Sequence, residues 1–263
     1  MSAVLTSSLG LMRRMPPSAC EKNLAGVSKL IENEEIVDQV YQRVDKPLEL
    51  GVCETTGNQF ILCEFNRDGD SYRSPYSNNY QPPLPDSHGP SADLRQMEIK
   101  ANDIFSEYRK LYYEGGTASA YLWDTNPNEF AGAFLVKKDL GPSGIVEKGA
   151  WESTNLVTVR LSPESRTITY VITTTVFLQI TINDPVAGKV ELSGSVSRQN
   201  QETAAANSNL YADAHIYGMI FAVENMESKL RSSIDMIYVG KTSEILDKTR
   251  KVEPEVRSRY KLA

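Results

Sequence analysis

Three side chains that could bind a cation stand at alternate positions in the first third of the chain. They are Asn66, Asp68 and Asp70, within the segment CEFNRDGDSYRSPYSNNYQPPLPD. Amide and carboxylate oxygens at positions 1, 3 and 5 are how a calcium-binding loop begins. Such a loop also needs Gly at position 6 and Glu at position 12, where this chain has Ser71 and Ser77.

A tight turn at Asp68-Gly69 is the favoured interpretation of this stretch, because Gly accepts positive φ and Asp bonds its own backbone. The preceding segment NQFILCEF alternates in polarity, whereas a calcium loop would follow a helix. No metal and no cofactor are therefore expected. The prolines that follow predict an irregular segment without regular ladders; they are Pro75, Pro82, Pro83, Pro85 and Pro90.

Other residue types that support catalysis are few, and no catalytic residue is predicted. The two histidines, His88 and His215, have no nucleophile partner that sequence reveals, so structural roles are favoured over a Cys-His pair. Trp123-Asp124 and Trp151-Glu152 each place an aromatic ring beside a carboxylate. The favoured interpretation puts Trp in the core and the carboxylate on the opposite face of a strand. A hydrolase built on Asp68, Asp70 and Asp124 remains an alternative.

The bulk composition indicates an intracellular protein that does not bind nucleic acid. The chain has 263 residues and a net charge of -6, which disfavours binding to phosphate backbones. Its three cysteines have neither disulfide nor zinc spacing, which suggests a reducing compartment. No transmembrane segment and no signal peptide are recognisable, so a cytoplasmic location is expected.

The elements that would position these residues begin with three short helices over residues 1–48, expected to form an antiparallel helical stalk. Ser18 and Glu21 predict a capping box for the second helix. Residues 49–116 follow, with strand-like and Pro-rich parts and a helix over 91–113. Ser91 is expected to cap that helix and Gly115-Gly116 to end it. Its predicted apolar stripe is Leu94, Met97, Ala101, Ile104, Tyr108 and Leu111.

Residues 117–200 change to a period of two, typical of strands. Five runs rich in β-branched and aromatic residues are separated by short turn signals such as Asn126-Pro127 and Ser162-Pro163. Connections this short join antiparallel neighbours, so a five-stranded meander is predicted, with sheet edges that need a partner.

A second long amphipathic helix is predicted over residues 209–240, long enough to cross the sheet. Its predicted stripe is Ile216, Ile220, Val223, Met226, Leu230, Ile234 and Ile237. The chain ends in a short basic tail, residues 241–263, suited to an acidic partner or simply solvated. From these patterns alone, the chain is an intracellular α+β interaction protein.

Five segments in colinear order resemble the beta subunit of the F-actin capping protein family. They are GLMRRMPPSACEKNL, the Asp68 segment quoted above, YEGGTASAYLWD, FAGAFLVKK and ENMESKLRSSIDMIYVGKT. The resemblance runs from about Leu11 to Thr242. It implies an α+β fold that forms half of a mushroom-shaped heterodimer, in which both subunits contribute strands to one sheet.

The resemblance also implies a function. A heterodimer with a capping protein alpha subunit would bind the barbed end of an actin filament in the cytoskeleton and block subunit addition and loss, without calcium and without chemistry. Implied regulators are peptides with the capping protein interaction motif, myotrophin-like proteins and acidic phosphoinositides. Arg13, Arg14 and Tyr80 are stalk candidates for regulator binding. A non-enzymatic scaffold that uses its basic tail to bind an acidic protein is the alternative.

The C-terminal tail departs from the family pattern. Family members end in an amphipathic helix that contacts actin, whereas this tail is short and Pro254 interrupts it. The expected actin contacts are Ile245, Leu246, Lys248, Arg250, Lys251, Val252, Val256, Arg257, Arg259, Tyr260 and Leu262. Fewer apolar contacts predict faster dissociation than in relatives with a full tail.

Overall fold

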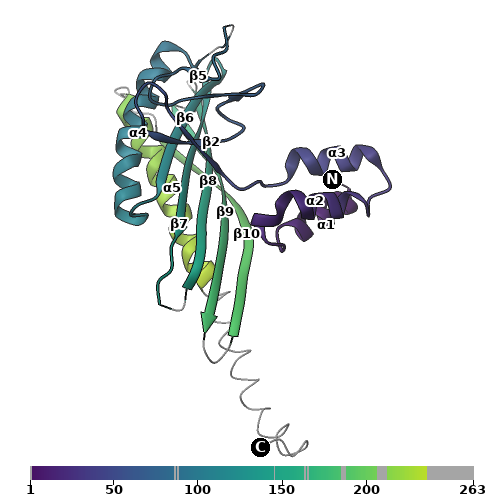
Figure 1. The fold of residues 1–263 in the computed structure, drawn as a ribbon. Coiled ribbons are helices and arrows are strands. Elements are labelled where there is room, and N and C mark those ends of the chain that lie inside the picture. The colour runs from purple at the N-terminus through teal and green to yellow at the C-terminus, as the bar shows by residue number, and fades with distance from the viewer. Residues whose placement is uncertain are drawn as a thin grey trace, which may run out of the picture. The chain divides into compact units, whose positions relative to one another are not determined.

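The structure is a computed structural model, and it describes residues 2–85, 87, 89–144, 146–162, 164, 166–184, 188–205 and 212–235. The chain divides into two compact units, Met1–Val223 and Glu224–Ala263. Figure 1 shows the elements in chain order. The last helix, α5 (Ala212–Asp235), belongs to the first unit up to Val223 and to the second beyond it.

The N-terminal helical unit, residues 3–43, consists of α1 (Ala3–Met12), α2 (Cys20–Ser28) and α3 (Glu34–Arg43). The helices enclose a small core of Leu5, Met12, Leu24, Val27 and Val40. The predicted capping box at Ser18 is wrong, because Pro17–Ala19 form a 3-10 turn and α2 begins without a side-chain cap. The preceding prolines start this turn early and leave Ser18 inside it.

Two small sheets follow the helical unit. β1 (Glu49–Val52) pairs with β2 (Gln59–Leu62), and β3 (Arg67–Asp68), β4 (Ser71–Arg73) and β5 (Tyr80–Gln81) form a three-stranded sheet. Asp68 pairs with Ser71, and Gly69 has φ +58°, so the predicted tight turn is confirmed. The expectation of no ladder among the prolines is wrong, because β5 lies between Pro75 and Pro82 and pairs with β4, which ends before Pro75.

Helix α4 (Ala92–Tyr112) buries Leu94, Met97, Ala101 and Tyr108, as predicted. Leu111 is 80% exposed, and Phe105 is buried in its place. The predicted spacing was too short, because 3.6 residues per turn carry Leu111 about 100° around the helix from Leu94. Ile104 is accordingly only half-buried.

Ser91 stands at the N-cap position of α4, but the predicted cap is wrong in its bonding. Its hydroxyl does not cap the helix. Instead its N–H and Oγ donate to the carboxylate of Asp124, at 2.8 and 2.9 Å. Asp124 lies on β6 (Thr117–Asn126), so this strand anchors the start of the helix.

Asp124→Ala should lower the free energy of unfolding by about 1 kcal/mol, the usual effect of losing a helix cap or a hydrogen bond to a charged group. Urea denaturation of the two proteins would measure the difference. Asp103→Ala serves as the control, because Asp103 is an exposed residue of α4, the helix that Asp124 anchors. Equal stability of the Asp124 and Asp103 variants would contradict this role.

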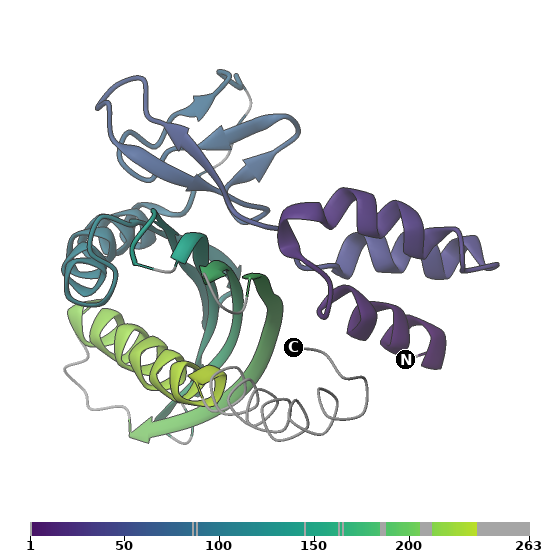
Figure 2. The same cartoon turned by 60° about the horizontal axis from the view of Figure 1, so that its bottom comes forward.

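The predicted five-stranded antiparallel sheet is confirmed, in the order β10-β9-β8-β7-β6. Besides β6 it contains β7 (Glu129–Leu140), β8 (Val146–Ser162), β9 (Thr167–Asp184) and β10 (Gly188–Ala205). Each strand is antiparallel to its neighbour in the chain, as short connections require. Figure 2 shows the strands as a curved layer with α4 against one face.

Strands β6 and β7 are buried on both faces, which explains their continuous apolar runs. On one face, Phe134 meets Phe105 of α4 edge-on, with ring centroids 5.3 Å apart. On the other, Tyr121, Ala133 and Leu135 pack with Ile61 of β2. In β8, buried and half-buried residues alternate from Asn155 to Val159, the pattern of a strand covered mainly on one face.

The beginning of α5 is held by His215, which is 8% exposed. Its Nδ1 lies 3.4 Å from the hydroxyl of Tyr170 on β9, and its ring meets Phe130 of β7 edge-on. The predicted α5 stripe is largely correct, since Ile216, Val223, Met226, Leu230 and Ile234 are buried. Met219 is buried where Ile220 was expected, and Ile237 lies outside the described residues.

Acid should destabilise the fold through His215. Burial lowers the pKa of His215 below its ordinary value of 6.5, so the unfolded chain binds this proton more readily. The contribution to stability is therefore complete above about pH 6.5 and falls as the pH drops below it. Urea denaturation between pH 7.5 and 5 measures the free energy of unfolding. This free energy should fall more steeply with decreasing pH for the native protein than for His215→Gln. Identical slopes would show that His215 does not carry the effect.

Candidate interaction surfaces

The three alternating side chains of the first sequence motif do not converge on a common point. Asn66 is buried, and its amide accepts from the N–H of Cys63 at 3.0 Å and donates to the carbonyl of Arg73 at 2.9 Å. Asp68 and Asp70 lie on an exposed hairpin. The amide of Asn66 therefore holds the chain together at the base of this hairpin.

The hydrolase alternative finds no assembled site in the part of the chain that the structure describes. There, no group of three or more His, Cys, Asp or Glu side chains is placed to hold a metal ion. Asp124 is engaged with Ser91, while Asp68 and Asp70 belong to the β3–β4 hairpin. His88 lies outside the described residues, and His215 is a buried contact of α5.

The cysteines are placed as structural side chains. Burial raises the pKa of Cys63 to about 12, so its thiol stays protonated at neutral pH. Burial also raises the pKa of Cys20. For Cys53, burial raises the pKa, but hydrogen bonds from nearby hydroxyls, Ser74 first, outweigh it and lower the value to about 6. Cys53 is 0% exposed, so a substrate cannot reach it.

The two Trp-carboxylate pairs place their members on opposite faces, but Glu152 is more buried than expected. Trp151 is half-buried, 6.2 Å from the ring of Tyr113. Glu152 is only 4% exposed, accepts from the N–H of Leu48 at 2.7 Å and pairs with Lys137. The segment that enters the sheet from the helical unit covers this face of β8, and Glu152 anchors it there.

A buried ion cluster joins the three-stranded sheet to α4 and β6, and it was not predicted from the sequence. Glu98 is fully buried and accepts two hydrogen bonds of 2.7 Å from Arg73. It also accepts from the N–H of Leu122 at 2.8 Å and pairs with Arg95. The one sequence signal for this cluster was the carboxylate of Glu98, which lies between Met97 and Ala101 on an otherwise apolar helix face.

Strand β10 forms an edge of the five-stranded sheet in the described structure. It pairs with β9 along its whole length, from Gly188 to Ala205. The N–H of Ser195 points away from β9, since it donates to the carbonyl of Arg13 at 3.0 Å. In an antiparallel ladder, residues two apart share this direction, so alternate backbone groups of β10 face outward.

The three predicted regulator-binding residues lie on two separate elements. Arg13 and Arg14 are exposed at the end of α1, and the Nε of Arg13 donates to Asp45 at 3.1 Å. Tyr80 is half-buried on β5, and burial raises its pKa. All predicted tail contacts, residues 245–262, lie outside the described residues.

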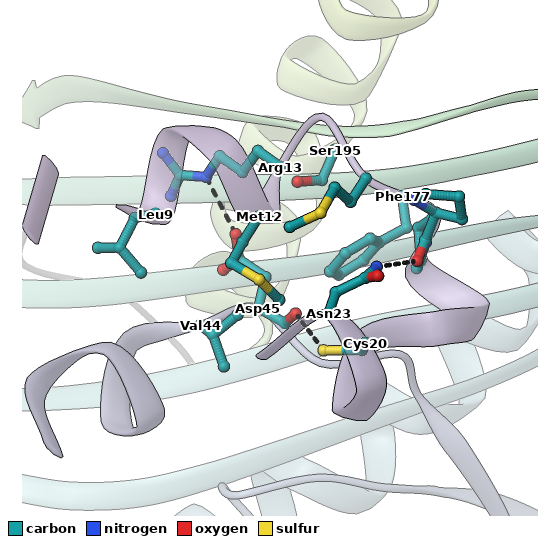
Figure 3. A pocket seen from close by; sticks show the side chains of 12 residues that line it. Leu9, Met12, Arg13, Cys20, Asn23, Val44, Asp45, Phe177 and Ser195 are labelled. Carbon is teal, nitrogen blue, oxygen red and sulfur yellow. Dashed lines mark hydrogen bonds and ion pairs between the residues drawn. The ribbon is translucent and has the colours of Figure 1, made fainter. Parts of the chain in front are cut away.

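A small cavity of about 20 Å³ lies beside the contact between the end of α1 and strands β9 and β10. Figure 3 shows Met12, Arg13, Phe177 and Ser195 around it. This volume is enough for about one water molecule, so the cavity is a packing gap and not a substrate pocket. Within the described helices, none is long and apolar enough to cross a membrane.

A solved structure has the same fold. The chain matches the structure of the homodimeric actin capping protein alpha subunit from Plasmodium berghei with a TM-score of 0.55 and 14% identity. The match covers 93% of this chain and 94% of that one. The chain therefore belongs to the same fold class as that capping protein subunit.

Sequence comparisons place the chain within that class. The family model for F-actin capping protein, beta subunit, matches residues 5–246. A protein named F-actin-capping protein subunit beta from Arabidopsis thaliana is 42% identical over 92% of this chain and 93% of its own. One of the same name from Dictyostelium discoideum is 40% identical over 94% and 89%. The chain belongs to the F-actin capping protein beta subunit family.

Proposed function

We propose that this chain is the beta subunit of a heterodimer that binds the barbed end of actin filaments and blocks subunit addition and loss. Membership of the beta subunit family is the observation that carries the proposal. The activity needs no chemistry and no cofactor, because an obstacle at the filament end suffices. Its place would be the cytoskeleton of the cytoplasm.

An alpha subunit is the partner that the proposal requires. An edge strand of 18 residues exposes alternate N–H and C=O groups, which natural proteins cover or pair. A strand of the alpha subunit on β10 would satisfy these groups and extend the sheet. The isolated chain should accordingly be poorly stable, since such obligate interfaces resemble a divided core.

Contacts with actin and with regulators are the finer parts of the proposal. The basic and apolar tail residues given above, from Ile245 to Leu262, would contact the terminal actin subunits. Arg13, Arg14 and Tyr80 are proposed for peptides with the capping protein interaction motif. Myotrophin-like proteins and acidic phosphoinositides are proposed as further regulators. Competition binding with a labelled motif peptide tests the first of these, and no binding would remove it.

Co-expression with a candidate alpha subunit tests the heterodimer. The two chains should co-purify and elute together in size-exclusion chromatography. Gln201 lies an even number of residues from Ser195, so its N–H is expected to face outward, and Gln201→Pro should weaken the complex without breaking the β9 ladder. Gln201→Ala is the matched control. A stable monomer that ignores the alpha subunit would favour a scaffold function instead.

A further inference from the structure

The helical unit occupies one position on the edge of β10. Ser195 lies opposite Phe177 in the β9–β10 ladder, yet its N–H donates to the carbonyl of Arg13 at 3.0 Å. This N–H therefore belongs to the backbone groups of β10 that face away from β9, which we call the outward row. A neighbouring strand could not form its ladder bond at Ser195 while Arg13 remains there.

The carbonyl of Arg13 is available because α1 ends at this residue. Arg13 is the C-cap, and the last carbonyls of a helix have no intrahelical donor. Two unsatisfied backbone groups, one at a helix end and one at a sheet edge, thus satisfy each other. The contact has the chemistry of a helix cap supplied by another element.

The side chain of Arg13 fixes the position of this carbonyl. Its Nε donates to Asp45 Oδ2 at 3.1 Å, which ties the end of α1 to the segment just after α3. The Arg13 side chain is 42% exposed and that of Asp45 24%, so solvent screens the pair only in part. Met12 and Phe177 both line the adjacent cavity and provide apolar surface beside this contact (Figure 3).

We propose that the end of α1 is an edge cap on β10, held closed by the Arg13–Asp45 ion pair. With the cap closed, the outward row is interrupted at Ser195, and a partner strand can pair only to one side of it. With the cap open, the row is continuous. Given the proposed heterodimer, the helical unit thereby controls how far along β10 a strand of the alpha subunit can extend.

Hydrogen exchange of single amides in the full chain tests the edge cap. Asp45→Asn and Arg13→Gln should each raise the exchange rate of the Ser195 amide roughly twofold to fivefold, the range expected for losing a partly screened ion pair. Amides of the β7–β8 ladder should keep their rates. Arg14→Gln is the control, because Arg14 is exposed at the same helix end and has no described bond to Asp45.

Two results would overturn the edge cap. An unchanged Ser195 rate in both variants would show that the ion pair does not hold the contact. A uniform rise in amide exchange rates across β7, β8 and β10 would show that the ion pair stabilises the whole fold and not the contact at Ser195 in particular. Ser195→Pro supplies an independent check, since it deletes the outward N–H and leaves the bonds to β9. In this background the contact with Arg13 cannot form, so adding Asp45→Asn should leave the exchange rates of the remaining β10 amides unchanged.

Discussion

Glu98→Ala should lower the free energy of unfolding by about 3–5 kcal/mol, the usual cost of removing one partner of a buried ion pair. The substitution would leave the guanidinium of Arg73, which is 3% exposed, without its two 2.7 Å bonds. It would also leave the N–H of Leu122 without its acceptor. Urea denaturation followed by circular dichroism measures the loss.

Glu107→Ala is the matched control for Glu98, because it lies on the same helix in an exposed pair with Lys110. Surface pairs of this kind contribute about 0–1 kcal/mol. If the two variants lost the same stability, the buried cluster would not be what joins the three-stranded sheet to α4 and β6.

Removing residues 249–263 should make the capping complex leave filament ends at least tenfold faster. The deletion takes away Val252, Val256, Tyr260 and Leu262, and a single buried aliphatic side chain contributes about 1.5 kcal/mol. That free energy corresponds to about a tenfold change in affinity, which appears mostly in the dissociation rate. Single-filament microscopy of capped ends measures the rate.

A second variant separates the apolar from the basic contribution of the tail. Val256→Ser with Leu262→Ser keeps every charge, so it should speed dissociation while the salt dependence stays as in the native complex. If truncation and substitution both left the rate unchanged, the tail would not contact actin.

The sheet and the long helices could be predicted because their causes are local. Pairs such as Asn126-Pro127 mark the turns between strands, and period-two runs mark the strands themselves. Errors arose at element ends. Ser18 and Ser91 were both given local caps, but a proline-induced turn displaced the first, and the second bonds to Asp124, 33 residues away.

The contacts that hold the elements together could not be predicted, because each joins residues far apart in the chain. Glu152 binds the N–H of Leu48 across 104 positions, and nothing in either local pattern points to the other. Arg73 and Glu98 lie in segments that looked independent, a Pro-rich loop and a helix. The role of Arg13 at Ser195 depends on a helix end that meets a sheet edge, which only the assembled fold specifies.

Capping of actin filaments by this chain, as part of a heterodimer, is tested most directly by elongation of pyrenyl actin from stabilised filament seeds, with the chain co-purified with an alpha subunit. The complex should stop barbed-end elongation at substoichiometric concentration relative to actin. A complex truncated at Lys248 should need a higher concentration for the same effect. Elongation at an undiminished rate, with a complex shown to be intact, would show that the chain does not cap filaments.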